Sequence, residues 1–234
     1  MRKILQILLF LITPVFAFAQ FSQVINTNEK VQELEKYAGS VYVSKDYQQA
    51  TVIDQNSKTY DARLKYNIYT DALEHQKAGK LHEVIKSPTT YARINDEYYY
   101  FCEFRNERGH KRFGYYILIE MNDAYRVYKK YSLKITDPKE LDPMTGNSVT
   151  GKIKRIATYY LEEGNEIKKL PLNKKDILTA FSDKEEELKD YIKKEKIRLK
   201  KEEDLIRLVA KYNALKNIDS NQQRSLLSSR VQNN

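Results

Sequence analysis

The three histidines are the first residues to consider for metal chemistry, because imidazole is the commonest metal ligand among side chains. A zinc-protease helix needs two histidines four residues apart, with a glutamate after the first, so that both rings reach one metal ion. The segment His82-Glu83-Val84-Ile85-Lys86 begins this pattern and has a lysine where the second ligand belongs. His75 and His110 have no second ligand at a metal-binding spacing. No metal site and no cofactor are therefore predicted.

Nucleophilic and nucleotide chemistry have no recognisable motif in this sequence. Cys102 is the only cysteine, no local histidine partner can be assigned to it, and the chain has no Gly-x-Ser-x-Gly nucleophile turn. Cys102 lies within Tyr98–Phe104, where a small apolar side chain fits a strand core, so a structural role is preferred to a reactive or intermolecularly paired thiol. The seven glycines occur singly, whereas a phosphate-binding loop needs several ahead of a helix.

Acidic residues leave one enzymatic alternative open. Glycosidases use two carboxyl groups that flank the scissile bond. The candidates of this type are Glu97, Glu103, Glu120, Glu162 and Glu163, and no pair among them is favoured without a fold. An exported hydrolase with a carboxylate site is therefore the alternative function, and it requires acidic side chains that converge in a pocket.

Positive charge is distributed unevenly along the chain, whose formal net charge is +9. Between residues 183 and 204, eight basic residues accompany nine acidic ones, which is typical of solvated helix faces. Between residues 105 and 134, eight basic residues accompany only three acidic ones, and this excess falls on predicted strands. A basic surface of this kind suits an anionic envelope partner, which is a protein, a lipid headgroup or a glycan. Nucleic acid is not expected, because an exported protein seldom meets it.

One predicted strand in this basic region is the candidate binding element. Side chains alternate between the two faces of a strand, and the odd positions of residues 125–135 are largely apolar. The even positions are therefore expected to face outward, and the predicted binding residues are Arg126, Tyr128, Lys130 and Lys134. If they are exposed, replacing Arg126, Lys130 and Lys134 with serine changes the unfolding free energy by no more than about 1 kcal/mol. The structural alternative is that the lysines only prevent edge-to-edge pairing with another sheet.

An antiparallel β region is predicted over residues 39–170. Strands are expected at residues 41–43, 51–53, 62–68, 97–105, 112–120, 124–135, 156–161 and 166–170. Short polar turns join the three long central strands, which predicts a meander, sandwich-like or part of an open barrel. The strand over 112–120 is apolar on both faces and must be covered on both. A Pro- and Gly-containing loop is expected over 136–152, and the 19 tyrosines fit half-buried strand positions.

A helical segment is predicted over residues 171–217, so the fold class is α+β. Asn173 is expected to cap its first helix, and Ser182 with Glu185 forms a capping-box pattern before the second. The apolar positions of the three helices are Ile177, Leu178, Phe181, Leu188, Tyr191, Ile192, Leu205, Leu208, Val209, Tyr212 and Leu215. Because helices this short cannot bury their apolar faces alone, we expect them to pack on the sheet.

Both ends of the chain are predicted to lie outside the folded body. Residues 1–19 combine a basic start, an apolar run and a small-residue cleavage box, which predicts a signal peptide cleaved before Gln20. The apolar run is shorter than the roughly 20 residues of a membrane-spanning helix, so no transmembrane span is expected after cleavage. An N-terminal extension over 20–38 is expected to contain a short helix that Gly39 ends. Residues 218–234 are rich in Ser, Asn and Gln and are expected to be a disordered tail.

Four segments carry a resemblance to other proteins. They are Gly39–Val43, Leu64–Asp71, the aromatic strands of residues 97–135, and Tyr191–Asn213. Together they resemble a group of uncharacterised exported envelope proteins of Gram-negative bacteria, over most of the mature chain. The resemblance implies the periplasm or the outer surface as location, with the β part and the helices forming one unit, and it implies no established activity. The predicted function is a non-enzymatic envelope protein that serves as a binding or accessory module.

Overall fold

The computed structural model describes residues 22–55, 59–105, 109–122, 124–138, 150–163 and 166–216. Its strands are β1 (Ser22–Val24), β2 (Gln48–Asp54), β3 (Thr59–Asn67), β4 (Ala72–Lys77), β5 (Lys80–Val84), β6 (Thr90–Ile94), β7 (Glu97–Arg105), β8 (Lys111–Met121), β9 (Arg126–Thr136), β10 (Lys152–Glu163) and β11 (Glu166–Leu170). Its helices are α1 (Glu29–Leu34), α2 (Lys174–Ala180), the 3₁₀ turn η1 (Ser182–Lys184), α3 (Glu185–Lys194) and α4 (Glu202–Leu215). The predicted signal peptide and the predicted tail lie outside the described residues.

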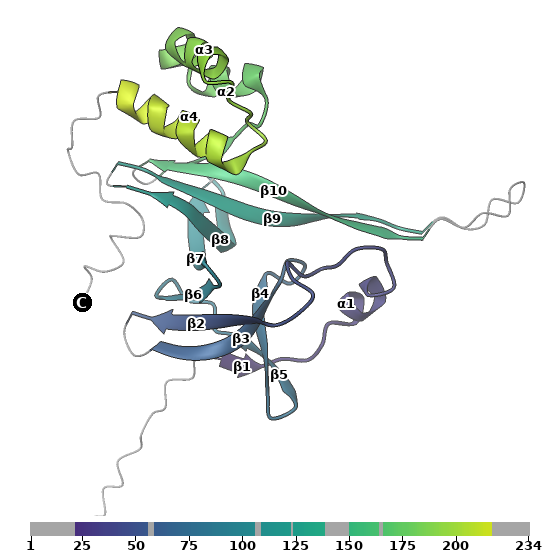
Figure 1. Cartoon of the computed structure of the whole chain (residues 1–234). Coiled ribbons are helices and arrows are strands. Elements are labelled where there is room, and N and C mark those ends of the chain that lie inside the picture. Colours follow the sequence, from purple (N-terminus) through teal and green to yellow (C-terminus); the bar gives the residue numbers. More distant parts are fainter. Residues whose placement is uncertain are drawn as a thin grey trace, which may run out of the picture.

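The strands form one open antiparallel sheet in the order β1-β5-β4-β3-β2-β6-β7-β8-β9-β10-β11. Because β6 to β11 follow one another both in the sequence and in the sheet, this part is a simple meander. Helices α2, α3 and α4 lie together above β9 and β10 (Figure 1). The predicted α+β architecture, an antiparallel meander followed by a helical segment packed on it, is confirmed.

Strand β8 is covered on both faces, as its apolar sequence predicts. On one face, Tyr115 and Ile117 belong to a core that extends across the sheet to Val84 of β5. On the other face, Tyr116 belongs to a core that includes Phe104 of β7 and Ile167 of β11. Each core joins strands that are several positions apart in the sheet, so the sheet must curl around each of them.

A third core joins the helices to the sheet. It contains Tyr125, Val127, Tyr159, Leu161 and Leu170 from the sheet, and Ile177, Leu178, Phe181, Leu188, Ile192, Ile197, Leu199, Leu205, Leu208, Val209 and Tyr212 from the helical segment. The rings of Phe181 and Tyr212 stack with their centroids 3.9 Å apart. The expected packing of the helices on the sheet is therefore confirmed. Within the described ranges, no helix is both long enough and apolar enough to cross a membrane.

The helix ends only partly follow the sequence patterns. Asn173 caps α2 as predicted, because its side-chain oxygen accepts a hydrogen bond of 2.9 Å from the backbone N–H of Asp176. The capping box predicted from Ser182 and Glu185 is wrong. Ser182 begins the turn η1, and α3 begins at Glu185 with no side-chain cap. Three glutamates in its first turn interact favourably with the helix dipole instead.

The N-terminal part differs most from the sequence-based expectation. Helix α1 ends at Leu34, well before Gly39, and β1 pairs with β5 at the sheet edge. Residues 41–43 form a single antiparallel bridge between Tyr42 and Asn67 rather than a strand. The hairpin β4–β5 and strand β6 were not predicted. The hairpin turns at Ala78 and Gly79, which both have positive φ, as a tight two-residue turn requires.

Candidate functional site

The four predicted binding residues lie on the same face of β9 but at very different depths. Arg126 is 9% exposed and Tyr128 is fully buried, whereas Lys130 is half-buried and Lys134 is exposed. The prediction that these four residues share one exposed face is therefore wrong for Arg126 and Tyr128. The physical reason is the curl of the sheet, which brings β11 towards β7 and covers this end of the β9 face.

Arg126 and Tyr128 form a buried cluster with Glu162 of β10. The Tyr128 hydroxyl donates a hydrogen bond of 2.6 Å to Glu162, and an Arg126 Nη1 atom lies 3.8 Å from the other carboxylate oxygen. Burial, aided by the charge of Glu162, raises the pKa of Tyr128, so its hydroxyl stays protonated and remains a donor. These contacts are structural. The predicted limit of about 1 kcal/mol on the change in unfolding free energy assumed an exposed Arg126, and this side chain is buried.

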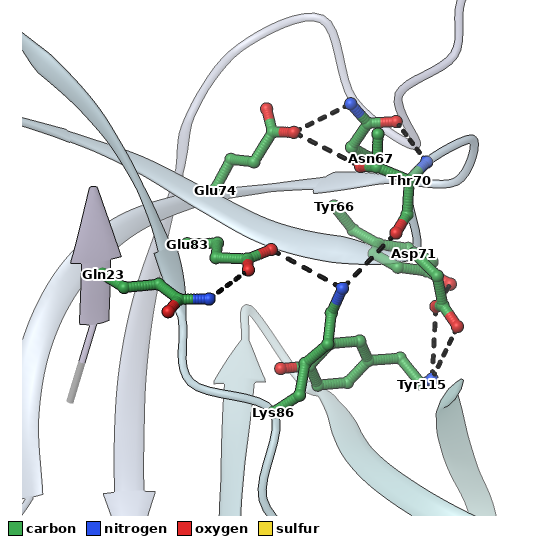
Figure 2. A network of polar contacts seen from close by, with 9 residues as sticks. All are labelled: Gln23, Tyr66, Asn67, Thr70, Asp71, Glu74, Glu83, Lys86 and Tyr115. Carbon is green, nitrogen blue, oxygen red and sulfur yellow. Dashed lines mark hydrogen bonds and ion pairs between the residues drawn. The ribbon is translucent and has the colours of Figure 1, made fainter. Parts of the chain in front are cut away.

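Lys130 is held by an ion pair that fills a gap between two strands. The pairing of β8 with β9 ends at Ile117 and Lys129. Beyond that point, Lys130 Nζ lies 3.1 Å from Asp71 Oδ2 and donates to the carbonyl oxygen of Tyr115 at 3.2 Å. The Tyr115 backbone N–H donates to both carboxylate oxygens of Asp71, at 3.2 and 3.3 Å. Figure 2 shows these two contacts. The ion pair thus replaces the missing strand partner of Tyr115.

Lys134 is the one predicted residue of the four that lies on open surface, and the register gives it basic neighbours. Lys154 of β10 stands directly opposite Lys134, and Lys152 stands opposite Thr136. The exposed side chains on this face of the β9–β10 ribbon are Ser132, Lys134, Thr136, Lys152, Lys154 and Ile156, and we call this surface the cationic face. Among the described residues, none of its three lysines has an ion-pair partner.

The opposite face of the ribbon is fixed to the rest of the fold. Ile153 is buried against Val31 and Leu34 of α1, and Leu133 and Ile135 of β9 pack against the same cluster. Figure 1 shows this ribbon extending from the sheet past α1. The cationic face is therefore presented by a backbone that is anchored from behind.

A second polar cluster surrounds a buried carboxyl group at Glu74, which is 2% exposed. Figure 2 shows it beside Asn67 and Thr70, and the Asn67 amide donates to Glu74 Oε1 at 2.8 Å. The Tyr42 hydroxyl donates to Oε2 at 3.0 Å. Burial raises the pKa of Glu74, and these neutral donors only partly oppose that effect. The cluster ties residues 41–43 to the turn between β3 and β4.

A histidine pair lies within the paired strands of the hairpin β4–β5. His75 and His82 stand directly opposite each other, with ring centroids 5.2 Å apart. Burial and the neighbouring ring of His82 lower the pKa of His75. His82 was not recognised as a neighbour of His75, because the hairpin that brings the two rings together was not predicted. No group of three or more His, Cys, Asp or Glu side chains that could hold a metal ion occurs among the residues described.

The glutamates of the hydrolase alternative mostly have separate basic partners. Glu97 lies 2.8 Å from Lys129, Glu103 lies 2.6 Å from Lys111, and Glu163 lies 3.1 Å from Lys216. Glu162 belongs to the buried cluster of Arg126 described above. Glu162 and Glu163 are also consecutive in β10 and therefore point to opposite faces of the strand.

Comparison with known proteins gives no functional lead. No protein-family model matches the chain, and neither a curated protein nor a solved structure matches it. The cationic face remains as a candidate surface, because Lys134 and Lys154 stand directly opposite each other on it and Lys152 lies on the same exposed face.

Proposed function

We propose that this protein is an exported binding module of the cell envelope that contacts an anionic partner through the cationic face. Phosphate-bearing lipid headgroups are the best fit among anionic partners. A two-stranded ribbon presents an extended row of side chains rather than a pocket, and Ile156, 40% exposed, adds an apolar side chain suited to a membrane interface. Export rests on the predicted signal peptide over residues 1–19.

The observation that carries this proposal is the pairing of Lys134 with Lys154. Like charges directly opposite each other on neighbouring strands destabilise a sheet. Lys152 adds a third charge on the same exposed face, and none of the three lysines has an ion-pair partner among the described residues. An anionic surface would relieve this repulsion. The alternative explanation, that the lysines only discourage sheet-to-sheet pairing, predicts no such binding.

Vesicle binding tests the proposal. Each lysine close to an anionic membrane surface contributes about 1 kcal/mol. We therefore expect the variant Lys134→Gln, Lys152→Gln, Lys154→Gln to bind phosphatidylglycerol-containing vesicles about 100-fold more weakly than the unmodified mature protein. Binding should also fall in 0.5 M salt and be absent with phosphatidylcholine alone.

A matched control separates this site from net charge. The variant Lys174→Gln, Lys175→Gln, Lys200→Gln removes three exposed lysines of the helical segment and changes the charge equally. It should bind like the unmodified protein. Equal losses in both triple variants, or no vesicle binding by the unmodified protein, would refute the proposal. Capture by a soluble acidic polysaccharide but not by vesicles would instead identify a glycan as the partner and refute the lipid assignment.

A further inference from the structure

A cavity of about 240 Å³ lies between the segment that follows α1 and Lys65, near the end of β3. Its lining includes the hydroxyl-bearing Ser40, the carboxylate-bearing Glu35, the ring of Tyr42, and the two lysines Lys45 and Lys65. Apolar walls with a few convergent polar groups are typical of small-ligand sites. Leu34 and Val41 supply apolar wall here.

Lys65 is the most unusual group of this cavity, because aromatic rings hold its charge in place. Its Nζ atom lies 4.4 Å from the centroid of the Tyr42 ring and 5.0 Å from that of Tyr47. Cation–π contacts of this kind stabilise an ammonium group without neutralising it. The half-buried ammonium is therefore preorganised at the cavity.

The natural counter-ion of Lys65 is engaged elsewhere. Glu74 stands directly opposite Lys65 in the sheet. Its carboxylate accepts hydrogen bonds from Asn67 at 2.8 Å and from the Tyr42 hydroxyl at 3.0 Å instead. In the described part of the chain, neither Lys65 nor Lys45 has an ion-pair partner. Tyr42 thus does two things, since its ring supports Lys65 and its hydroxyl binds Glu74, the carboxylate that stands opposite Lys65 in the sheet.

We propose that this cavity binds a monosaccharide-sized anion, with its phosphate or carboxylate group between Lys45 and Lys65. Lysine ammonium groups bind such anions as point charges. The oxygen of Ser40 already accepts from the Tyr42 backbone N–H at 3.1 Å, so its hydroxyl proton is available to the ligand. Glu35 at the cavity wall accepts hydrogen bonds, which suits the hydroxyl groups of a sugar. This site uses none of the residues of the cationic face and is independent of the proposed function.

Calorimetric titration of the mature protein tests the inference with glucose 6-phosphate, glucuronate, glucose and inorganic phosphate as probes. We expect saturable binding of glucose 6-phosphate or of glucuronate, and the tighter of the two identifies the anionic group. Glucose should bind at least tenfold more weakly, because it lacks the charge. Lys65→Gln should weaken binding of the charged sugar at least tenfold, as expected for a charge-assisted contact. Lys45→Gln should weaken it as well.

The control is Lys80→Gln, which removes an exposed lysine from the hairpin turn of β4–β5 and should leave the affinity unchanged. Thermal unfolding of each variant confirms that it is folded. Failure of both charged sugars to bind would overturn the inference, and so would equal affinities of the Lys65 and Lys80 variants. Binding of inorganic phosphate as tight as that of glucose 6-phosphate would overturn the assignment of a sugar ligand.

Discussion

Replacing Gly114 with alanine should destabilise the fold much more than removing an ordinary turn glycine. Gly114 lies in β8 with a φ of +148°, a conformation that residues with a side chain rarely adopt. A Cβ atom at this position would collide with both Asp71 Oδ2 and Lys130 Nζ. These two groups occupy the gap between β8 and β9 and bond to the backbone of Tyr115. The substitution therefore combines backbone strain with disruption of the ion pair.

The expected loss is the sum of these two effects. Holding a non-glycine residue in such a conformation costs of order 1–3 kcal/mol. Moving Asp71 and Lys130 away leaves the Tyr115 N–H and C=O without their partners, and an unsatisfied buried group costs about 1–3 kcal/mol. We expect Gly114→Ala to lower the unfolding free energy by at least about 3 kcal/mol, the sum of the lower limits for the strain and for the two unsatisfied groups. For a protein of this size the midpoint of thermal unfolding shifts by roughly 2–4 °C per kcal/mol.

Urea unfolding followed by circular dichroism measures this loss, with Gly79→Ala as the control. Gly79 also has a positive φ, +72°, but an added Cβ would meet nothing within 4 Å. Its replacement should cost only the backbone strain, about 1–2 kcal/mol. The double variant Asp71→Ala, Gly114→Ala should lose less stability than the two single losses added together, because one change removes an obstacle for the other. Equal losses for Gly114→Ala and Gly79→Ala would refute the reasoning.

Three further predictions concern pH, packing and the helical segment. Burial lowers the pKa of His75 below its ordinary 6.5, so the unfolded chain binds the proton more tightly than the folded one. The unfolding free energy should therefore fall as the pH drops below about 6.5, by at most about 1.4 kcal/mol per pH unit. Urea unfolding of His75→Gln should show a shallower fall. Leu208→Ala opens a space in the core under α4 and should cost about 2–5 kcal/mol in the same assay, whereas a loss below 1 kcal/mol would contradict the packing. The excised segment 173–217 should show little helicity by circular dichroism, because its apolar faces need the sheet; a cooperative thermal transition would show an independent domain.

The meander and the helices could be predicted from the sequence because their signals are local. The predicted strand 97–105 coincides with β7, and β8 extends one residue beyond each end of the predicted 112–120. The apolar spacing of Leu205, Leu208 and Val209 gave the buried face of α4. The hairpin β4–β5 was missed because its strands mix apolar positions with buried polar ones, Glu74 and His75. The periodicity of hydrophobic residues does not reveal strands of this kind.

The exposure of the predicted binding residues could not be obtained in the same way. Alternation along β9 correctly placed Arg126, Tyr128, Lys130 and Lys134 on one face. It does not say how far the sheet curls over that face, which depends on contacts between β7 and β11. The partner of Lys130, Asp71, is 59 residues away in the sequence. Lys154 became a neighbour of Lys134 only through the register of β10.

Contacts between tyrosine hydroxyls and carboxylates help to explain why Lys65 is left without a counter-ion. Tyrosine hydroxyls donate to carboxylates repeatedly in the described residues: Tyr37 to Asp137, Tyr42 to Glu74, Tyr66 to Asp71, Tyr99 to Glu97, Tyr128 to Glu162 and Tyr159 to Glu202. A hydroxyl donor stabilises a half-buried carboxylate without bringing a second charge into the low-dielectric interior, which lowers the cost of desolvation. Asp71, Glu97, Glu162 and Glu202 also have basic partners. Glu74 differs, because among the described residues it is held by neutral donors without an ion pair. Lys65 shows the effect directly, because the Tyr42 hydroxyl holds Glu74, the carboxylate that stands opposite Lys65 in the sheet. The positive charge of Lys65 is then available to an anion from outside the chain.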